Sequence, residues 1–252
     1  MIGNPASCAQ ALVGGCIGAF PFRDGIDSGA SWWLVDTSAG NVEESEQPGV
    51  TLVLYRSESK DSGGPGRWRG GNSLTAACTP HKAFMAMAQM TFVDPSTNSA
   101  AGLAGGYYGL GTNLLRQGAN RVGQLLAAGK LPASRSELEQ LVGPFKRLHP
   151  KASIFPVPRG DCIVVEFNGA GGFGDPLDRE PERVRDDVRA ERISAAPASR
   201  HWGVVLRHDG EVDDEATRSR RSPSGCPSSS PLPHRRPRRA TAPRRRCVTR
   251  LA

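Results

Sequence analysis

Several side chains that could do chemistry lie close together in one stretch, DSGGPGRWRGG, at residues 61–71. Asp61 supplies a carboxylate, Ser62 a hydroxyl, and Arg67 and Arg69 two guanidinium groups. The many glycines and the proline exclude a helix and predict a tight irregular loop, because glycine alone visits positive φ without steric cost. Such a loop is typical of a ligand or interface element. The alternative is a well-packed turn.

The order DSGGP (61–65) resembles the nucleophile motif of trypsin-like proteases, so acyl transfer is the first chemistry to test. That chemistry needs a histidine within hydrogen-bond reach of the serine. In that family the histidine precedes the serine, yet no histidine occurs here before His81, and Lys60 stands where the protease pattern has glycine. A serine protease is therefore excluded, and Ser62 is predicted to be a turn residue.

Phosphate binding is a second chemistry that glycine-rich loops can support, because they can aim N–H groups at anions. A second loop of this kind, GAGGFG, spans residues 169–174. Neither loop carries the G-x-x-x-x-G-K-[ST] pattern of a phosphate loop. Tight turns at sheet ends are the favoured interpretation, and no nucleotide site is expected within this chain.

The remaining polar residues indicate no nucleophile, general base or metal ligand set. Isolated histidines, interpreted as structural or solvent-facing, occur at 81, 149, 201 and 208. Asp24 and Asp27 flank a glycine, which predicts Asx turns. The 6 cysteines are scattered, with no C-x-x-C pair and no histidine at metal-ligand spacing. This pattern predicts reduced thiols in a cytoplasmic protein and no metal site.

Strands and short helices must position these loops. Runs of β-branched and aromatic residues predict strands at 32–35, 50–56, 161–167 and 201–206. One helix is predicted from Pro181, with Val184 and Val188 as its apolar stripe. A second is predicted from a capping box at 136–139, with an apolar face formed by Leu138, Leu141 and Val142. Residues 84–93 fit either a strand or a helix. The loop at 61–71 follows a predicted strand directly, so it is expected at a sheet end.

Composition gives the fold class. Only 38% of the 252 residues are hydrophobic, and there are 30 glycines and 20 prolines. These values favour an α+β fold: a β-rich mixed-sheet domain with glycine-rich loops and a few short helices.

No apolar run approaches the ~18 residues that a membrane span needs. The segment VGGC (13–16) resembles a lipoprotein cleavage site, but residues 1–12 lack the basic residues of a signal peptide.

Charge divides the chain near residue 216. After Glu215 there is no acidic residue and no lysine, but there are 11 arginines. Leaving these out changes the net charge from +7 to −4, so nucleic-acid binding is not expected of the preceding residues. Residues 1–216 are interpreted as one domain and 217–252 as a disordered Arg/Pro/Ser-rich tail. The tail is either a basic arm for an anionic surface or, as we favour, the product of a reading-frame error in GC-rich DNA.

Taken in order, four segments resemble the carboxyl-terminal part of the hydantoinase B/oxoprolinase family. They are residues 14–29, residues 41–46 with the strand into 61–71, residues 150–188 and residues 200–217. The most specific is GGFGDPLDREP (171–181), which precedes the helix predicted from Pro181. The family motifs contain the candidate substrate-binding or interface residues Asp61, Ser62, Arg67, Arg69, Asp175 and Arg179.

The resemblance implies part of the large, B-type subunit of an ATP-dependent enzyme. Members of the family open cyclic amides such as hydantoins or 5-oxoproline, and others carboxylate ketones such as acetone or acetophenone. The resemblance implies no cofactor bound by this chain, ATP bound by a hydantoinase A-type partner subunit, and a divalent metal, where present, in an amino-terminal half that precedes the matched region. This chain alone is expected to be inactive.

The first hypothesis for the activity is a cyclic-amide hydrolase acting with the A-type partner. One alternative is a ketone carboxylase, which the form PGRWRGGN of the loop and the segment GLAGGYY (102–108) favour slightly. A second alternative is a non-catalytic assembly module.

Overall fold

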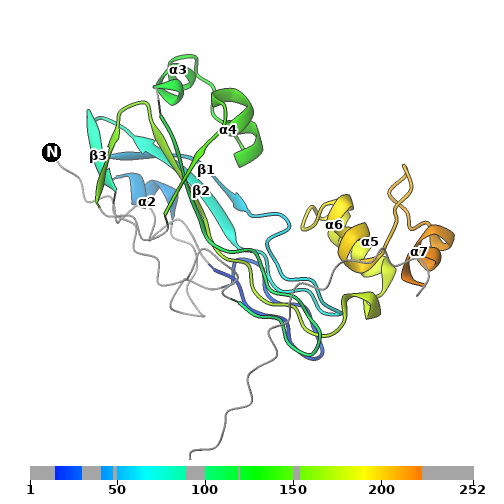
Figure 1. The fold of residues 1–252 in the computed structure, drawn as a ribbon. Helices are drawn as coiled ribbons and strands as arrows, with labels where there is room; N and C mark the ends of the chain where they lie inside the picture. The colour runs from blue at the N-terminus through cyan, green and yellow to red at the C-terminus, as the bar shows by residue number, and fades with distance from the viewer. Residues whose placement is uncertain are drawn as a thin grey trace, which may run out of the picture.

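The fold is seen in a computed structural model that describes residues 15–29, 41–47, 50–88, 100–118, 120–149 and 154–222. Figure 1 shows a β-sheet part and a separate group of helices, joined by long loops that run side by side. The predicted α+β class is confirmed. The strand predicted at 32–35 and the tail from residue 223 lie outside the described residues.

The main sheet has the strand order β1-β2-β7-β4-β5, and each neighbouring pair is antiparallel. Its strands are β1 (Thr51–Glu58), β2 (Leu74–Pro80), β4 (Asn113–Gln117), β5 (Lys146–Leu148) and β7 (Cys162–Glu166). A second, two-stranded sheet pairs β3 (Met85–Ala88) with β6 (Phe155–Pro158). The strands predicted around 50–56 and 161–167 are thus confirmed, and the ambiguous segment 84–93 begins as a strand.

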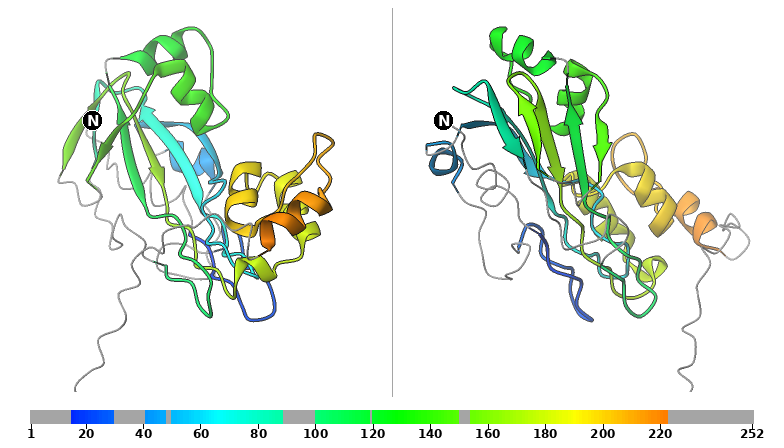
Figure 2. Two further views of the ribbon diagram at one scale, coloured as in Figure 1. Left: turned by 45° about the vertical axis from the view of Figure 1, so that its right-hand side comes forward. Right: turned by 60° about the vertical axis from the view of Figure 1, so that its left-hand side comes forward.

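Strand β7 lies at the centre of the sheet and is buried on both faces, as its unbroken apolar run requires. Ile163 and Val165 join a core with the small sheet and with Val42 of α2 (Val42–Glu46). Cys162 and Val164 face the opposite way, toward α3 (Arg121–Ala127) and α4 (Arg135–Val142). Figure 2 shows these two helices and α2 on opposite sides of the sheet.

The predicted second helix is confirmed as α4, but its cap lies two residues before the predicted one. Ser134 Oγ accepts the amide of Glu137, whose carboxylate accepts the amide of Ala133, so the capping box begins at Ser134. Leu138 and Val142 are buried as predicted, whereas Leu141 is exposed. The buried face of α4 is therefore formed by Leu138 and Val142, without the predicted Leu141.

Four glycine-rich segments form what we call the loop bundle: residues 15–29, 59–73, 100–112 and 167–175. They lie side by side below the sheet in Figure 1 and exchange backbone hydrogen bonds. The amide of Gly64 donates to Ala170 O at 2.7 Å, and that of Gly172 donates to Tyr107 O at 2.9 Å. A Cβ atom on Gly64 would collide with the backbone oxygen of Tyr107, so close approach requires glycine there.

We call residues 176–222 the helical module. It contains the short 3₁₀ helix η1 (Pro176–Asp178), α5 (Pro181–Arg189), α6 (Ala195–Trp202) and α7 (Asp214–Arg221). Its own small core is formed by Val184, Ile193, Ala198, Trp202, Val204 and Val212. The helix predicted from Pro181 is confirmed as α5. Helix α7 continues across the composition break at residue 216.

The strand predicted at 201–206 is wrong. His201 and Trp202 end helix α6, and Gly203 follows in the left-handed conformation with φ 65°. The apolar run Trp-Gly-Val-Val-Leu predicted a strand from propensity. The left-handed glycine that ends the helix outweighed that signal. Leu206 forms only an isolated bridge with Val212.

Candidate functional site

The loop at 61–71 leaves the end of β1 and runs along the loop bundle, so the prediction that it lies at a sheet end is confirmed. Asp61 occupies its first corner with φ 64°, a conformation unusual for a residue other than glycine. Its two carboxylate oxygens accept from the amide and the hydroxyl of Ser194, each at 2.6 Å. Asp61 therefore ties the loop to the helical module just before helix α6.

Ser62 is fully buried beside Asp61. Its hydroxyl accepts the amide of Ser73 at 2.9 Å and lies 3.5 Å from the side-chain oxygen of Asn72. These contacts bind the two ends of the loop to each other. The hydroxyl acts as an internal hydrogen-bonding group of the turn, with no open approach for a substrate.

Arg69 and Arg179, two of the predicted site residues, lie in one buried ion-pair network. Arg69 binds both carboxylate oxygens of Asp27, at 2.9 and 3.1 Å. Arg179 binds both oxygens of Asp24, at 2.6 and 2.9 Å. Asp187 of α5 accepts from Arg179 at 2.7 Å and lies 3.7 Å from Arg69. This network joins the loop bundle to the helical module through charge-assisted, bidentate pairs.

The charges in this network hold each other in the ionised state. Burial alone would raise the pKa of Asp24, but its hydrogen bonds with Arg179 and the charge of that guanidinium lower it below the usual range. Asp27 follows the same balance: burial opposes ionisation, and Arg69 lowers the pKa overall. Both carboxylates are therefore charged at neutral pH and serve as counter-ions for the two arginines.

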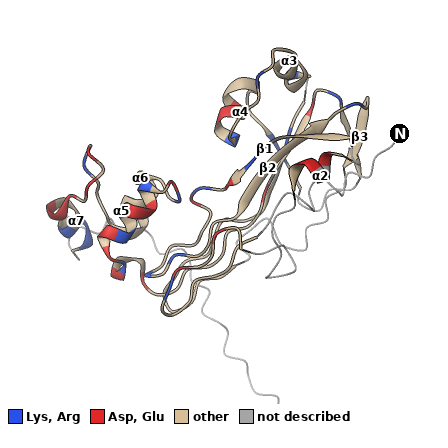
Figure 3. Cartoon of the chain, turned by 180° about the vertical axis from the view of Figure 1, so that it is seen from behind, with Lys and Arg blue, Asp and Glu red and all other residues tan. Residues whose placement is uncertain are grey.

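The side chains of the other two candidates, Arg67 and Asp175, are exposed and form no ion pair in this network, although the backbone oxygen of Arg67 accepts from Arg179 at 3.0 Å. Arg67 lies near the ring of Trp68, with the guanidinium carbon 5.9 Å from the ring centre. Asp175 caps helix η1 by accepting the amide of Leu177 at 2.9 Å. Figure 3 shows both positive and negative residues on the helical module that follows Asp175.

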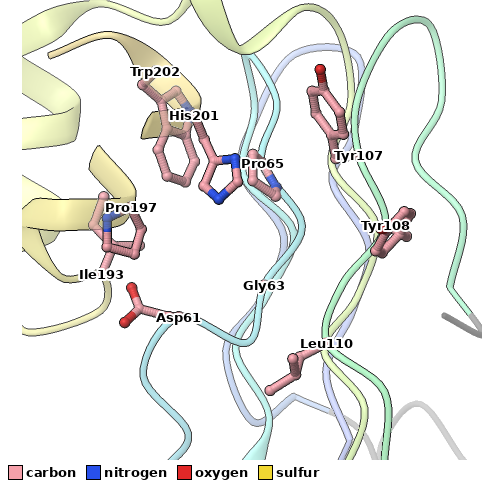
Figure 4. Close-up of a pocket in the computed structure, with 10 residues that line it drawn as sticks. All are labelled: Asp61, Gly63, Pro65, Tyr107, Tyr108, Leu110, Ile193, Pro197, His201 and Trp202. Carbon is pink, nitrogen blue, oxygen red and sulfur yellow. The ribbon is translucent and has the colours of Figure 1, made fainter. Parts of the chain in front are cut away.

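A pocket of about 240 Å³ opens where the loop bundle meets the helical module (Figure 4). Its apolar lining is formed by Pro65, Leu110, Ile193, Pro197 and Trp202. Its polar and aromatic lining is formed by Asp61, Tyr107, Tyr108 and His201, with Gly63 at the backbone. Among the six predicted site residues, Asp61 is the one that reaches this pocket.

His201 is the titratable side chain that projects into this space from α6 (Figure 4). Its ring centre lies 6.4 Å from that of Tyr107 and 6.1 Å from that of Trp202, which it meets edge-on. Burial, and then the positive charge of Arg200, lower the pKa of His201, while the charge of Asp61 opposes them. The imidazole is therefore neutral at pH 7 and can both donate and accept a hydrogen bond.

Sequence reasoning missed two features of this region. The isolated position of His201 in the sequence predicts a structural or solvent-facing side chain, because it carries no spacing signal. The spacing of Asp24 and Asp27 predicts Asx turns, yet the two carboxylates bind arginines far away in the chain and accept the amides of Arg69 and Asn72. The segment RDGID placed two carboxylates on one turn, and this charge spacing was the available signal.

A phosphate cradle requires glycine amides that point at the ligand. The amides of Gly64, Gly106 and Gly172 donate instead to carbonyl oxygens within the loop bundle. Across the described ranges, no three His, Cys, Asp or Glu side chains gather closely enough to hold a metal ion. These described residues thus do not fit a divalent metal site.

No helix in the described part of the chain has the length and apolarity to cross a membrane.

The described residues form an α+β domain, and its pocket lies between the glycine-rich loop bundle and the helical module. The sequence matches the Hydantoinase B/oxoprolinase family over residues 3–176, and the chain belongs to this family. The family resemblance seen in the sequence motifs is thereby confirmed.

The similar proteins include carboxylases and a caprolactamase subunit. The chain is 30% identical to the acetophenone carboxylase delta subunit of Aromatoleum aromaticum, over 81% of this chain and 31% of that protein. It is 27% identical to the caprolactamase subunit beta of Pseudomonas jessenii, over 73% of this chain and 28% of that protein. It is also similar to the nucleotide-free structure of acetone carboxylase, with a TM-score of 0.72 and 27% identity, over 86% of this chain and 30% of that chain. The chain thus spans less than a third of the length of these relatives.

Proposed function

We propose that this chain is part of the B-type subunit of an ATP-dependent enzyme that opens cyclic amides. Its family membership and its similarity to a caprolactamase subunit support this class of reaction. We further propose that ATP is bound by a hydantoinase A-type partner subunit, that any divalent metal is held outside the described residues, and that the complex works in the cytoplasm. Cys16 and Cys162 form no disulfide among the described residues, and such reduced thiols fit a reducing compartment.

The observation that carries the proposal is how the family motifs are used. Glycine amides of the loops form backbone hydrogen bonds, and Arg69 and Arg179 form ion pairs with the carboxylates of Asp27 and Asp24. These motifs therefore build a rigid support. Other parts of the complex supply the groups that phosphorylate the carbonyl oxygen of the substrate. The role of this chain in the complex is structural.

The test is substrate-dependent release of phosphate from ATP by the purified chain, measured alone and with a co-expressed A-type subunit. We expect no release by the chain alone, and release with the partner when hydantoin, 5-oxoproline or caprolactam is present. Robust turnover by the chain alone would overturn the proposed dependence on a partner. Turnover with acetone or acetophenone and bicarbonate, in place of a cyclic amide, would show a ketone carboxylase instead. No turnover in any combination would favour an assembly module.

A further inference from the structure

A second pocket, of about 490 Å³, lies beside helix α3, on the part of the sheet away from the loop bundle (Figure 1). Its lining shares no residue with the pocket at His201 or with the buried ion-pair network. We propose that this pocket binds a medium-chain carboxylate, with the alkyl chain on an apolar floor and the head group at Lys130 and Arg159. The inference does not rest on the proposed function, because such binding requires neither ATP nor a partner subunit.

The walls of the pocket come from three segments that hydrogen bonds hold together. The segments are the adjoining ends of β1 and β2, helix α3 with the turn after it, and the turn between β6 and β7. The hydroxyl of Thr79 donates to Asp161 O at 2.7 Å, and the amide of Val122 donates to Gly160 O at 3.1 Å. A Cβ atom on Gly160 would collide with the side chain of Asn120, so the close packing of this turn requires glycine. The walls are therefore fixed relative to one another.

The floor of the pocket is apolar, and its size suits a small molecule. Its apolar residues are Leu52, Pro80, Leu126, Ala127 and Leu131. Leu126 packs partly against the core beneath α3, whereas the side chain of Leu131 is 62% exposed. An alkyl chain that lies on these side chains removes apolar surface from water on both partners. The volume falls within the range of roughly 300–1,000 Å³ that is usual for small-molecule sites.

The rim of the pocket is positively charged. Lys130, Arg159 and His81 line it with exposed side chains, and the lining contains no Asp or Glu. Within the described ranges these three side chains form no ion pair, and Asp161, which follows the lining residues, is already paired with Arg116 at 2.9 Å. The lysine and arginine charges act in the same direction, so they attract an anion and repel a cation. A carboxylate fits, because a guanidinium can bind both of its oxygens.

The first experiment varies the ligand and measures binding to the full chain by ligand-observed NMR titration. Butanoate, hexanoate and octanoate differ only in chain length, and we expect affinity to rise about two- to fourfold for each added CH₂ group. Octanoate and octylammonium differ in the charge of the head group. Octanoate should bind about tenfold more tightly, and added salt should reduce this difference. No saturable binding of octanoate, or binding of octylammonium that is equal or tighter, would overturn the proposal.

Paired substitutions locate the binding, because the arginines of the tail also attract anions. The double variant Lys130→Gln with Arg159→Gln should weaken octanoate about tenfold and leave the uncharged octan-1-ol unaffected. The control, Lys146→Gln with Arg207→Gln, removes the same charges at exposed positions outside the pocket and should bind octanoate like the parent chain. Leu131→Glu places a carboxylate at the pocket and should abolish the preference for octanoate over octylammonium.

Circular dichroism checks that each variant is folded. Equal octanoate affinities for the two folded double variants would overturn the assignment of binding to this pocket.

Discussion

At the scale of single residues, the loop at 61–71 acts through what its side chains and amides hold together. The hydroxyl of Ser62 stabilises its own turn by accepting a hydrogen bond from the amide of Ser73. Asp61 accepts from Ser194, across the junction with the helical module. Gly64 permits the backbone of Tyr107 to approach so closely that no Cβ atom fits between them. Each residue is therefore required for a contact with a different segment.

A pair of substitutions tests these residue roles. Ser62→Ala leaves the buried amide of Ser73 without its acceptor. We expect a loss of roughly 1–3 kcal/mol in the free energy of unfolding. Gly64→Val should prevent folding, because the side chain would collide with backbone. The reason is close approach, since Gly64 is not among the residues with positive φ.

Urea unfolding followed by circular dichroism measures both variants. Leu131→Ala, at an exposed leucine, is the control and should unfold near the parent midpoint. Equal losses for Ser62→Ala and Gly64→Val would contradict the ranking. A Ser62→Ala variant as stable as the parent would show that the Ser73 amide finds another acceptor.

At the scale of elements, the buried ion pairs fix the helical module to the loop bundle. Arg179 precedes α5 and reaches back to Asp24, while Asp187 lies on α5 itself. A buried charge without its partner is costly, so these pairs specify one docking geometry. The same network explains why an arginine in the specific motif GGFGDPLDREP is buried.

Removing one partner should release this docking. Arg179→Met keeps an unbranched aliphatic stem but removes the ion pair of Asp24 and the shortest ion pair of Asp187, and we expect a loss of about 3–5 kcal/mol in the free energy of unfolding. Arg207→Met is the matched control, because the pair of Arg207 with Asp209 at 3.6 Å is exposed and should contribute less than ~1 kcal/mol. Chemical unfolding measures both variants. Equal effects would show that the buried network does not stabilise the fold.

The same carboxylates predict how stability depends on pH. Asp24 and Asp27 have pKa values lowered in the folded protein, so the unfolded chain binds their protons more readily. Their contribution is present above the unfolded pKa of about 3.9 and is lost as pH falls through the lower folded values. Urea midpoints should change little from about pH 7 to 5 on account of these groups and should fall steeply below about pH 4.

Arg179→Met supplies the control for this pH dependence. It removes the main partner of Asp24, so the fall in the urea midpoint below about pH 4 should become shallower than in the parent chain. An unchanged slope would mean that other carboxyl groups dominate the acid unfolding.

At the scale of the whole molecule, the ordered fold extends past the composition break at residue 216. The Thr217 hydroxyl accepts the amide of Val205 at 3.0 Å. Arg221 donates to Trp202 O at 2.9 Å and to Arg179 O at 2.8 Å. These bonds attach α7 to the helical module, although the arginine-rich composition begins within this helix.

Two truncations test where the structural unit ends. A chain that ends at Ser222 keeps all of these bonds and should melt at the same temperature as the full chain. A chain that ends at Ala216 loses the contacts of Thr217 and Arg221, and should be less stable by roughly 1–3 kcal/mol. Differential scanning calorimetry measures both truncated chains. Equal melting temperatures would place the boundary at residue 216, as the composition predicted.

Local patterns in the sequence determined much of the fold. The β-branched run at 161–167 predicted the strand β7, Pro181 marked the start of α5, and the motif strings identified the family. These signals are short-range, because propensity, caps and glycine content act within a few residues. Where two local signals competed, as around Trp202 and Gly203, the sequence prediction failed.

Only the tertiary structure decided which side chains form the site. Arg179 meets Asp24 across 155 positions of sequence, and Ser194 meets Asp61 across 133. His201 lies near Tyr107, which is distant in the chain, with their ring centres 6.4 Å apart. Burial, ion pairing and pKa depend on the path of the whole chain, because each is set by neighbours that folding brings together.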